Sequence, residues 1–231
     1  MKIIDLIYPR RCPVCDRPTP GERLICPECE NVPKRVKEPY CLKCGKQLDE
    51  DEADRCTNCK TTEHIYDRGR ALFLYPGISE SIYKFKYGSR PEYSEYYAEE
   101  IFKYLGDDIK AWNPDGIIAV PLHTSRMRKR GYNQAALIAR GLSQKTGIPY
   151  YDDYVKRCKK TIPMKELNAS ERQINLKKAF IVGNNDVKLY KVLIVDDIYT
   201  TGSTIDAMAD ALKQNGTSEV YFVTLSIGSG M

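Results

Sequence analysis

Two parts of the chain repeat one order of hydrophobic and polar positions, in which an apolar run and a polar segment precede an amphipathic stretch. Residues 192–195 read VLIV and residues 116–121 read GIIAVP, and such runs are typical of strands buried on both faces of a parallel sheet. After each run, apolar residues recur at i, i+3, i+4 and i+7, which predicts a helix. These positions are Ile205, Met208, Ala209 and Leu212 in one part and Ala135, Ile138, Ala139 and Leu142 in the other. Strand–loop–helix units of this kind predict an α/β fold, a parallel sheet flanked by helices, with both loops at the carboxyl edge of the sheet.

Two more helices are predicted between residues 78 and 105. Ile78, Ile82 and Phe85 form a short apolar stripe, and Gly88 follows where that helix would end. The face of the second helix consists of Tyr93, Tyr97, Ile101 and Leu105. Tyrosines could also form a surface on which bases stack, but their helical spacing favours core packing. Lys86 lies off the first stripe, at the polar end of its helix, from which it could reach a pyrophosphate.

Eight of the nine cysteines lie within the first 60 residues and form four C-x-x-C pairs. They are Cys12 and Cys15, Cys26 and Cys29, Cys41 and Cys44, and Cys56 and Cys59. A structural zinc ion is held tetrahedrally by four ligands, so eight thiolates predict two closed structural sites with no catalytic position left open. A disulfide framework is the main alternative, but nothing in the sequence marks the protein as secreted, and thiols stay reduced in the cytosol.

An internal repeat favours one way of pairing these cysteines. Residues 12–29 and 41–59 have similar lengths and a polar middle, and residues 31–40 between them contain two prolines and predict an extended connector. Each repeat is therefore expected to hold its own zinc ion. The spacing also allows a cross-brace arrangement, in which the first pair joins the third and the second joins the fourth. We expect a double zinc ribbon over residues 1–60 and a larger domain over residues 65–231.

Polar residues follow the apolar run at 192–195 and predict a sugar-phosphate site. Asp196 and Asp197 come first, and a turn with several hydroxyl groups leads into the predicted helix. The free N–H groups and the dipole of a helix N-terminus favour phosphate, whereas carboxylates would repel it and instead suit the hydroxyls of a ribose. A plain strand end followed by a helix cap is the simpler interpretation, although a cap needs one hydroxyl and no paired acids. The sequence has neither a G-x-x-x-x-G-K-[ST] motif nor a G-x-G-x-x-G motif after a strand, which gives no support to those two kinds of nucleotide site.

The stretch VLIVDDIYTTGST, residues 192–204, resembles the phosphoribosyl pyrophosphate (PRPP) signature of type I phosphoribosyltransferases. The resemblance implies that Asp196 and Asp197 hold the ribose hydroxyls and take the catalytic positions. The residues that would cradle the 5′-phosphate are Thr200, Thr201, Gly202, Ser203 and Thr204. Mg²⁺ would bind together with PRPP, mostly through the pyrophosphate, ribose hydroxyls and water.

Basic charge is concentrated in two segments, although the net charge is only +5. Residues 126–130 carry four positive charges, and residues 156–180 carry eight basic and two acidic side chains. Two such runs in one α/β domain favour phosphate-rich ligands over a plain solvated surface. No apolar run is long enough to cross a membrane and the N-terminus lacks a signal-peptide core, so we expect a cytoplasmic protein.

The loop after residues 116–121 extends the resemblance to the ComF family. AVPLHTSRMRKRGYNQA, residues 119–135, is similar to the family's V-P-…-R-x-x-x-R-G-[FY]-N-Q motif. Residues 161–180 match a second motif, in which Met164 stands where glutamine is usual. The family also has a double cysteine ribbon before a domain of the type I phosphoribosyltransferase fold. The resemblance thus covers essentially the whole chain.

This resemblance implies a role in natural transformation, where incoming single-stranded DNA is handled. Arg126, Arg128, Arg130 and Lys86 would neutralise the pyrophosphate, and residues 156–175 resemble the mobile hood that closes over the substrate in this fold. Three hypotheses stay open: a ComF-type factor that binds PRPP and single-stranded DNA, an active phosphoribosyltransferase with an unidentified acceptor, and a scaffold whose ribbon docks a helicase-like partner. His123 is a candidate acid–base residue, although a lone loop histidine is more often a hydrogen-bonding residue.

Overall fold

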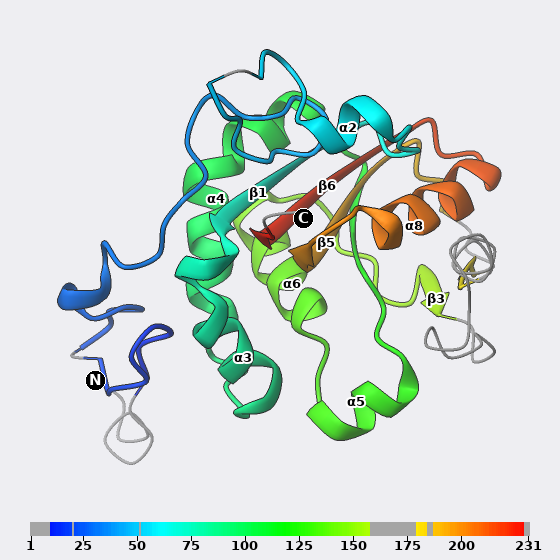
Figure 1. Cartoon of the computed structure of the whole chain (residues 1–231). Helices are drawn as coiled ribbons and strands as arrows, with labels where there is room; N and C mark the ends of the chain where they lie inside the picture. The colour runs from blue at the N-terminus through cyan, green and yellow to red at the C-terminus, as the bar shows by residue number, and fades with distance from the viewer. Residues whose placement is uncertain (1–9, 20, 51, 158–178, 184–186, 229–231) are drawn as a thin grey trace.

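The computed structural model describes residues 10–19, 21–50, 52–157, 179–183 and 187–228 of the chain. Within these ranges the central element is a four-stranded parallel sheet with the order β1-β6-β5-β2 (Figure 1). Its strands are β1 (Arg68–Leu74), β2 (Gly116–Ala119), β5 (Lys191–Tyr199) and β6 (Glu219–Ile227). The predicted parallel sheet is confirmed, and the two apolar runs are neighbours, because Val192 pairs with Gly116 and Val195 with Ala119.

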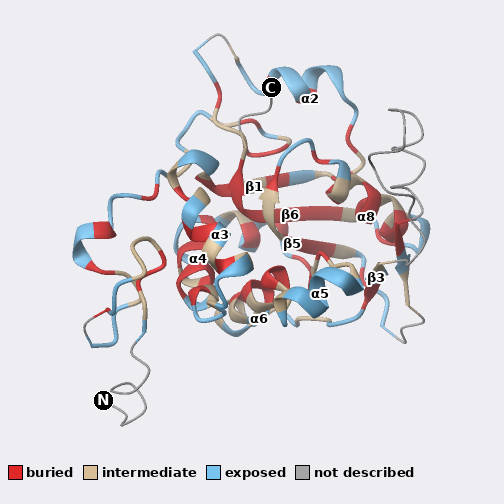
Figure 2. Ribbon diagram, turned by 60° about the horizontal axis from the view of Figure 1, so that its bottom comes forward, coloured by how far each residue is buried: buried red, intermediate tan, exposed pale blue. Residues whose placement is uncertain are grey.

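Helices cover both faces of this sheet (Figure 1). On one face lie α3 (Ser79–Tyr87), α4 (Tyr93–Trp112) and α6 (Gln134–Thr146), and their apolar residues share a buried cluster with Leu193 and Val223. On the other face α8 (Ser203–Gln214) packs against Val192 and Phe222. All four predicted helices are present, and Figure 2 shows that the strands between them are buried.

Three tyrosines in the first half of α4 belong to the core. Tyr93 and Tyr97 are buried with their rings in a T-shaped arrangement, 6.5 Å between centroids, and Tyr96 is buried beside them. The Tyr97 hydroxyl also forms a hydrogen bond with the hydroxyl of Ser81 on α3. Tyr93, Tyr96 and Tyr97 therefore pack between layers, as the helical spacing predicts, whereas Tyr104 on the same helix is exposed.

The two cysteine-rich repeats have different surroundings. The second contains α2 (Thr57–Thr61), and its four cysteines belong to the main core cluster together with Tyr199 and Ile205. The first contains the short 3₁₀ helix η1 (Pro27–Cys29), lies apart from the sheet and has a small cluster of its own (Figure 1). Asp16 anchors it, because the Arg90 Nε atom donates a hydrogen bond to this carboxylate at 2.8 Å.

A second, antiparallel sheet of β3 (Val155–Arg157) and β4 (Phe180–Val182) flanks residues 158–178. Most of the predicted hood, including Met164 and the lone Cys158, therefore lies outside the described residues. The remaining short elements are the 3₁₀ helix η2 (Tyr75–Gly77) and α5 (Thr124–Arg130). We expected a loop where α5 is found, because its seven residues have no apolar stripe.

Candidate functional site

The two acids of the PRPP-like signature lie inside β5, because the strand continues beyond Val195 to Tyr199. Successive residues of a strand face opposite sides of the sheet, so the two carboxylates have different neighbours. Asp197 faces α3, where Lys86 Nζ donates a hydrogen bond to its Oδ1 atom at 2.8 Å. Lys86, expected to reach a pyrophosphate, is thus paired with one of the acids expected to hold the ribose.

Asp196 is half-buried and has a perturbed pKa. Burial and the neighbouring Asp197 charge disfavour its ionised form, which raises the pKa to about 8 even though Lys86 and Arg157 act in the opposite direction. Its Oδ1 atom accepts a hydrogen bond from the Asp197 backbone N–H at 2.8 Å. Burial and the adjacent Asp197 charge therefore both favour the protonated form of this carboxyl group.

Arg157, at the end of β3, is a site residue that the sequence analysis missed. The charges of Asp196 and Arg126 both influence its pKa, which burial lowers, and its guanidinium lies 5.6 Å from the centroid of the Phe180 ring. Its Nε atom is buried and has no hydrogen-bond partner within the described part of the chain. A buried guanidinium N–H without a partner is costly, and an anionic or carbonyl ligand at this place would satisfy it.

The turn after β5 has the form of an anion site. Gly202 precedes α8 with a φ of 82°, and among the described residues no side chain caps this helix end. The N–H groups of the first turn, in Ser203 and Thr204 above all, thus remain available for a phosphate. Thr200, Thr201 and Ser203 are exposed, and the Thr201 and Ser203 hydroxyl oxygens lie 3.1 Å apart.

Gly202 is required at this place for a second reason besides its positive φ. A Cβ atom there would lie 2.6 Å from the Tyr199 hydroxyl and 3.0 Å from Cε1 of His64. The backbone of the turn therefore rests directly on two side chains, and any larger residue would displace it.

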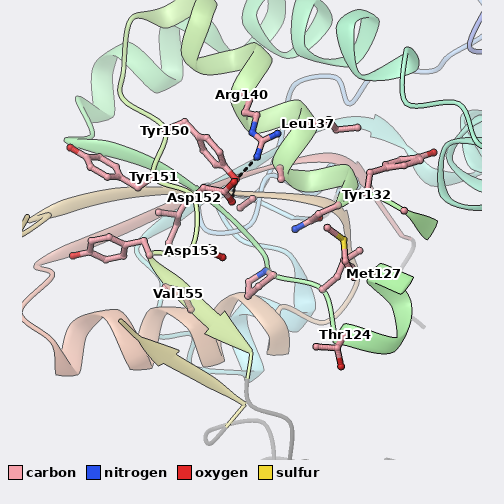
Figure 3. Close-up of a pocket in the computed structure, with 18 residues that line it drawn as sticks. Thr124, Met127, Tyr132, Leu137, Arg140, Tyr150, Tyr151, Asp152, Asp153 and Val155 are labelled. Atoms are coloured by element: carbon pink, nitrogen blue, oxygen red, sulfur yellow. Dashed lines mark hydrogen bonds and ion pairs between the residues drawn. The ribbon is translucent and has the colours of Figure 1, made fainter. Parts of the chain in front are cut away.

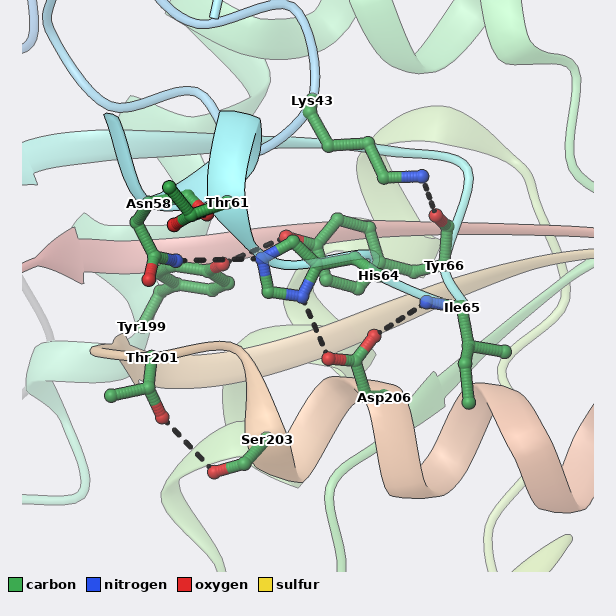
Figure 4. Close-up of polar contacts among 10 residues, drawn as sticks. All are labelled: Lys43, Asn58, Thr61, His64, Ile65, Tyr66, Tyr199, Thr201, Ser203 and Asp206. Carbon is green, nitrogen blue, oxygen red and sulfur yellow. Dashed lines mark hydrogen bonds and ion pairs between the residues drawn. The ribbon is translucent and has the colours of Figure 1, made fainter. Parts of the chain in front are cut away.

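His64 supports the turn from the side of the second cysteine-rich repeat (Figure 4). Its fully buried ring approaches Asp206, in the first turn of α8, with 2.7 Å between Nδ1 and Oδ2. The other Asp206 oxygen accepts a hydrogen bond from the Ile65 backbone N–H at 2.8 Å, and Nε2 of His64 lies 3.4 Å from Nδ2 of Asn58. Asn58 lies between Cys56 and Cys59, so these contacts join a predicted zinc site to the phosphate turn.

The three arginines predicted to bind pyrophosphate lie on α5 rather than in a loop. Asn133 Nδ2 donates to the Val120 carbonyl at 3.0 Å and so fixes the connection from β2 to α6. Arg126 and Arg128 are exposed, whereas Arg130 is half-buried and donates hydrogen bonds to Gln134 and to the Tyr87 hydroxyl, each at 2.9 Å. His123 caps α5 by accepting from the Ser125 N–H, which gives it a structural role.

The eight clustered cysteines form two separate groups of four. In each group the four sulfur atoms lie within 4.8 Å of one another, and the groups are Cys12, Cys15, Cys26 and Cys29, and Cys41, Cys44, Cys56 and Cys59. A tetrahedral zinc ion with bonds of about 2.3 Å holds its sulfurs about 3.8 Å apart. The Cys15–Cys26 and Cys44–Cys56 sulfur distances, 3.6 and 3.7 Å, fit this geometry, and all eight thiols are free. Sequential pairing is confirmed, and the cross-brace alternative is wrong.

A cavity of about 470 Å³ lies beside this edge of the sheet (Figure 3). Ile118, Pro121 and Leu137 give it apolar walls, and α5 contributes Met127. On another wall Asp152 accepts hydrogen bonds from Arg140 and Tyr150. Its lining includes neither signature acid nor any residue of the phosphate turn, so the cavity is separate from the PRPP-like site.

Three residues of this region could not be recognised from sequence patterns. Asp206 looks like an ordinary acid in a first helical turn, and His64 follows the second repeat without any motif. Arg157 is one of many basic residues in its segment. Only their proximity to Gly202 and Asp196 in the folded chain reveals them.

Comparisons with known proteins agree with this architecture. Residues 3–60 match the family described as "Double zinc ribbon domain", and residues 107–227 match "Phosphoribosyl transferase domain". Competence protein F of Haemophilus influenzae is 34% identical over 199 residues, covering 83% of this chain and 86% of that protein. Competence protein ComFC of Streptococcus pneumoniae is 26% identical, with 87% and 86% covered. DNA utilization protein YhgH of Escherichia coli K12 is 29% identical, with 90% and 86% covered.

No described helix combines the length and the apolar character needed to cross a membrane. The parallel sheet flanked by helices is the type I phosphoribosyltransferase-like fold, and the two four-cysteine groups are the metal sites of the ribbon. With these two domains, and with 34% identity to Competence protein F over most of its length, the chain belongs to the ComF family.

Proposed function

We propose that the chain binds PRPP together with Mg²⁺ and uses this site in DNA uptake, where it handles incoming single-stranded DNA. One observation carries the proposal: two acids of β5 lie next to a phosphate turn whose helix end has no side-chain cap in the described part of the chain. The hydroxyl pair of a ribose matches the two acids, and the 5′-phosphate at the other end of the same sugar matches the open helix end.

In this proposal each part of PRPP has its own protein partners. The 5′-phosphate binds the N–H groups of residues 200–204, and the ribose hydroxyls bind Asp196 and Asp197. The arginines of α5 neutralise the pyrophosphate, and Lys86 turns toward it from Asp197. Mg²⁺, when bound, offsets the charge of the pyrophosphate. The names of the relatives, competence protein and DNA utilization protein, support the role in DNA uptake.

Isothermal titration calorimetry with PRPP and Mg²⁺ tests the proposed site. Asp196→Asn combined with Asp197→Asn removes both carboxyl groups that are proposed to accept hydrogen bonds from the ribose hydroxyls and should weaken binding by about a hundredfold or more. Asp210→Asn, further along α8, is the matched control and should leave the affinity unchanged. Equal affinity of the double variant and the control would show that the signature does not bind the sugar.

Phosphoribosyl transfer is a second candidate activity, favoured by Arg157. Its buried Nε atom lacks a partner among the described residues, and it lies where the predicted hood joins β3. A guanidinium there could hold an acceptor against the ribose. Transfer would be supported if the protein releases pyrophosphate from PRPP in the presence of nucleobases and Arg157→Lys abolishes this release. If no acceptor causes release, the site binds PRPP without transferring its ribosyl group.

A further inference from the structure

Two exposed tyrosines lie one turn apart on α3, on the side away from its buried residues. Tyr83 is 63% exposed and Tyr87 is 49% exposed, whereas Ile82 and Phe85 are buried. The two rings are neighbours, with centroids 5.1 Å apart and planes tilted by 47°. Neither ring is part of the core, so the sequence keeps a pair of aromatic rings in contact with water.

Two cations from α5 contact one of these rings, that of Tyr87. The Arg130 guanidinium lies 4.8 Å from the Tyr87 ring centroid and donates a hydrogen bond to its hydroxyl, and Lys129 Nζ lies 5.8 Å from the same ring. The α5 sequence TSRMRKR has four cations and no acid. Within the described ranges, no acid forms an ion pair with Arg126, Arg128 or Lys129, so their charges are free for an external anion.

The helix that carries the two tyrosines also contacts the proposed PRPP site. Lys86, which binds Asp197, directly precedes Tyr87 in the chain. Tyr132, which follows α5, donates a hydrogen bond from its hydroxyl to the Phe85 carbonyl and so holds α5 against α3. The tyrosine pair therefore lies on a helix that directly contacts one of the ribose acids.

We propose that Tyr83, Tyr87 and the cations of α5 form a binding platform for single-stranded nucleic acid. The bases stack on the tyrosine rings, and the backbone phosphates lie along Arg126, Arg128 and Lys129. The faces of the bases are accessible only in a single strand, because in a duplex they are covered by their neighbours. This inference rests on the proposed function and assigns its DNA-binding surface. An acidic peptide would satisfy the cations but would not need two neighbouring rings.

Fluorescence anisotropy of a labelled thymidine 20-mer, titrated with the full-length protein at several salt concentrations, tests the platform. Tyr83→Ala combined with Tyr87→Ala should weaken binding by about tenfold or more without changing the salt dependence, because stacking involves no charge. Tyr190→Ala is the matched control, since this tyrosine is 60% exposed, directly precedes β5 and belongs to neither α3 nor α5. Tyr87→Phe should bind like the unmodified protein because the ring remains.

The cations have a different expected signature. Arg128→Gln combined with Lys129→Gln should lower the slope of log affinity against log salt by about 1.4, because each lost phosphate contact contributes about 0.7 on a single strand. An equally strong loss for double-stranded DNA, or displacement of the oligonucleotide by polyglutamate with no tyrosine dependence, would overturn the platform.

The outcomes separate this inference from the proposed function. If the unmodified protein does not bind the oligonucleotide even at low salt, the proposed handling of DNA fails and the platform fails with it. If the unmodified protein binds but the double tyrosine variant binds as tightly as Tyr190→Ala, only the platform is overturned. PRPP calorimetry on the double tyrosine variant should show unchanged affinity, which establishes that the variant is folded.

Discussion

His64 lies against Asp206 with 2.7 Å between Nδ1 and Oδ2, and this contact joins the segment after the zinc ribbon to the helix that begins at the phosphate turn. Because Asn58 Nδ2 can only donate a hydrogen bond to Nε2, the ring proton belongs on Nδ1 and faces the carboxylate. The ribbon thus supports the floor of the proposed PRPP site, although its own metal sites are closed.

His64→Leu should therefore affect both stability and ligand binding. Leucine keeps most of the volume but removes the partner of a partly buried carboxylate, which should lower the free energy of unfolding by about 1–3 kcal/mol in urea denaturation. PRPP affinity in calorimetry should fall as well, because Gly202 loses its support. His123→Leu, at the cap of α5, is the control; equal losses in the two variants would mean that His64 has no special role.

The two zinc sites should respond differently to the loss of a ligand. Native mass spectrometry should find about two zinc ions per chain, and Cys12→Ser should lose one while the site of Cys56 stays filled. Because Cys56 lies in the main core cluster and Cys12 in a separate one, Cys56→Ser should also destabilise the larger domain. Four disulfides and no zinc would contradict both expectations.

The pKa of Asp196 predicts a pH dependence of stability. Its folded-state value of about 8 lies above the usual 3.8, so the folded protein binds the extra proton between these values. The contribution of Asp196 to stability is therefore fully present below about pH 4 and is lost as the pH rises toward 8. Urea denaturation at several pH values should show this decrease, and Asp196→Asn should remove it.

PRPP binding should have the opposite pH dependence. The ribose hydroxyls donate to an ionised carboxylate, so affinity should rise between pH 6.5 and 8.5 by up to about tenfold per unit and then level off. The phosphates of PRPP also titrate near the lower end of this range. In Asp196→Asn only the phosphates contribute to the pH dependence, so this variant is the control for their effect. A profile that is the same in both proteins would mean that Asp196 does not ionise on binding.

Lys86→Met tests the ion pair with Asp197. Both side chains are only 15% exposed, so the variant leaves a partly buried carboxylate without its cation and should lose about 1–3 kcal/mol of stability in urea. Lys84→Met is the control on the same helix: Lys84 pairs with Glu80, which is 78% exposed, and its loss should cost less than about 1 kcal/mol. Indistinguishable variants would show that the Lys86 pair contributes nothing beyond a surface contact.

Local sequence determined the elements of the fold and the chemistry of the metal sites. The apolar runs at 116–121 and 192–195 predict buried strands, which β2 and β5 confirm, and two C-x-x-C pairs within each repeat suit one zinc ion per repeat. The four helices were also predicted from the sequence, because the spacing of their apolar residues follows the 3.6-residue period of the helix itself. The acids and the phosphate turn were also recognised, since all thirteen residues of that motif are contiguous.

The tertiary structure alone decided what lies beside those elements. The strand runs on through Asp196 and Asp197, because β6 continues alongside it and supplies hydrogen-bond partners as far as Tyr199. A helix forms at α5 without an apolar stripe, since a cap at His123 and the left-handed Gly131 define its ends. Such features depend on neighbours that no local pattern describes.

The contacts between distant segments also arise only from tertiary packing. His64 and Asp206 are 142 residues apart, and Lys86 and Asp197 are 111 apart, so no spacing rule relates them. Tyr83 and Tyr87 look like any helical tyrosines until α5 brings its cations against them. The sequence therefore determined the fold class and the two four-cysteine sites and predicted a sugar-phosphate motif, whereas long-range packing decided which side chains support and surround that motif.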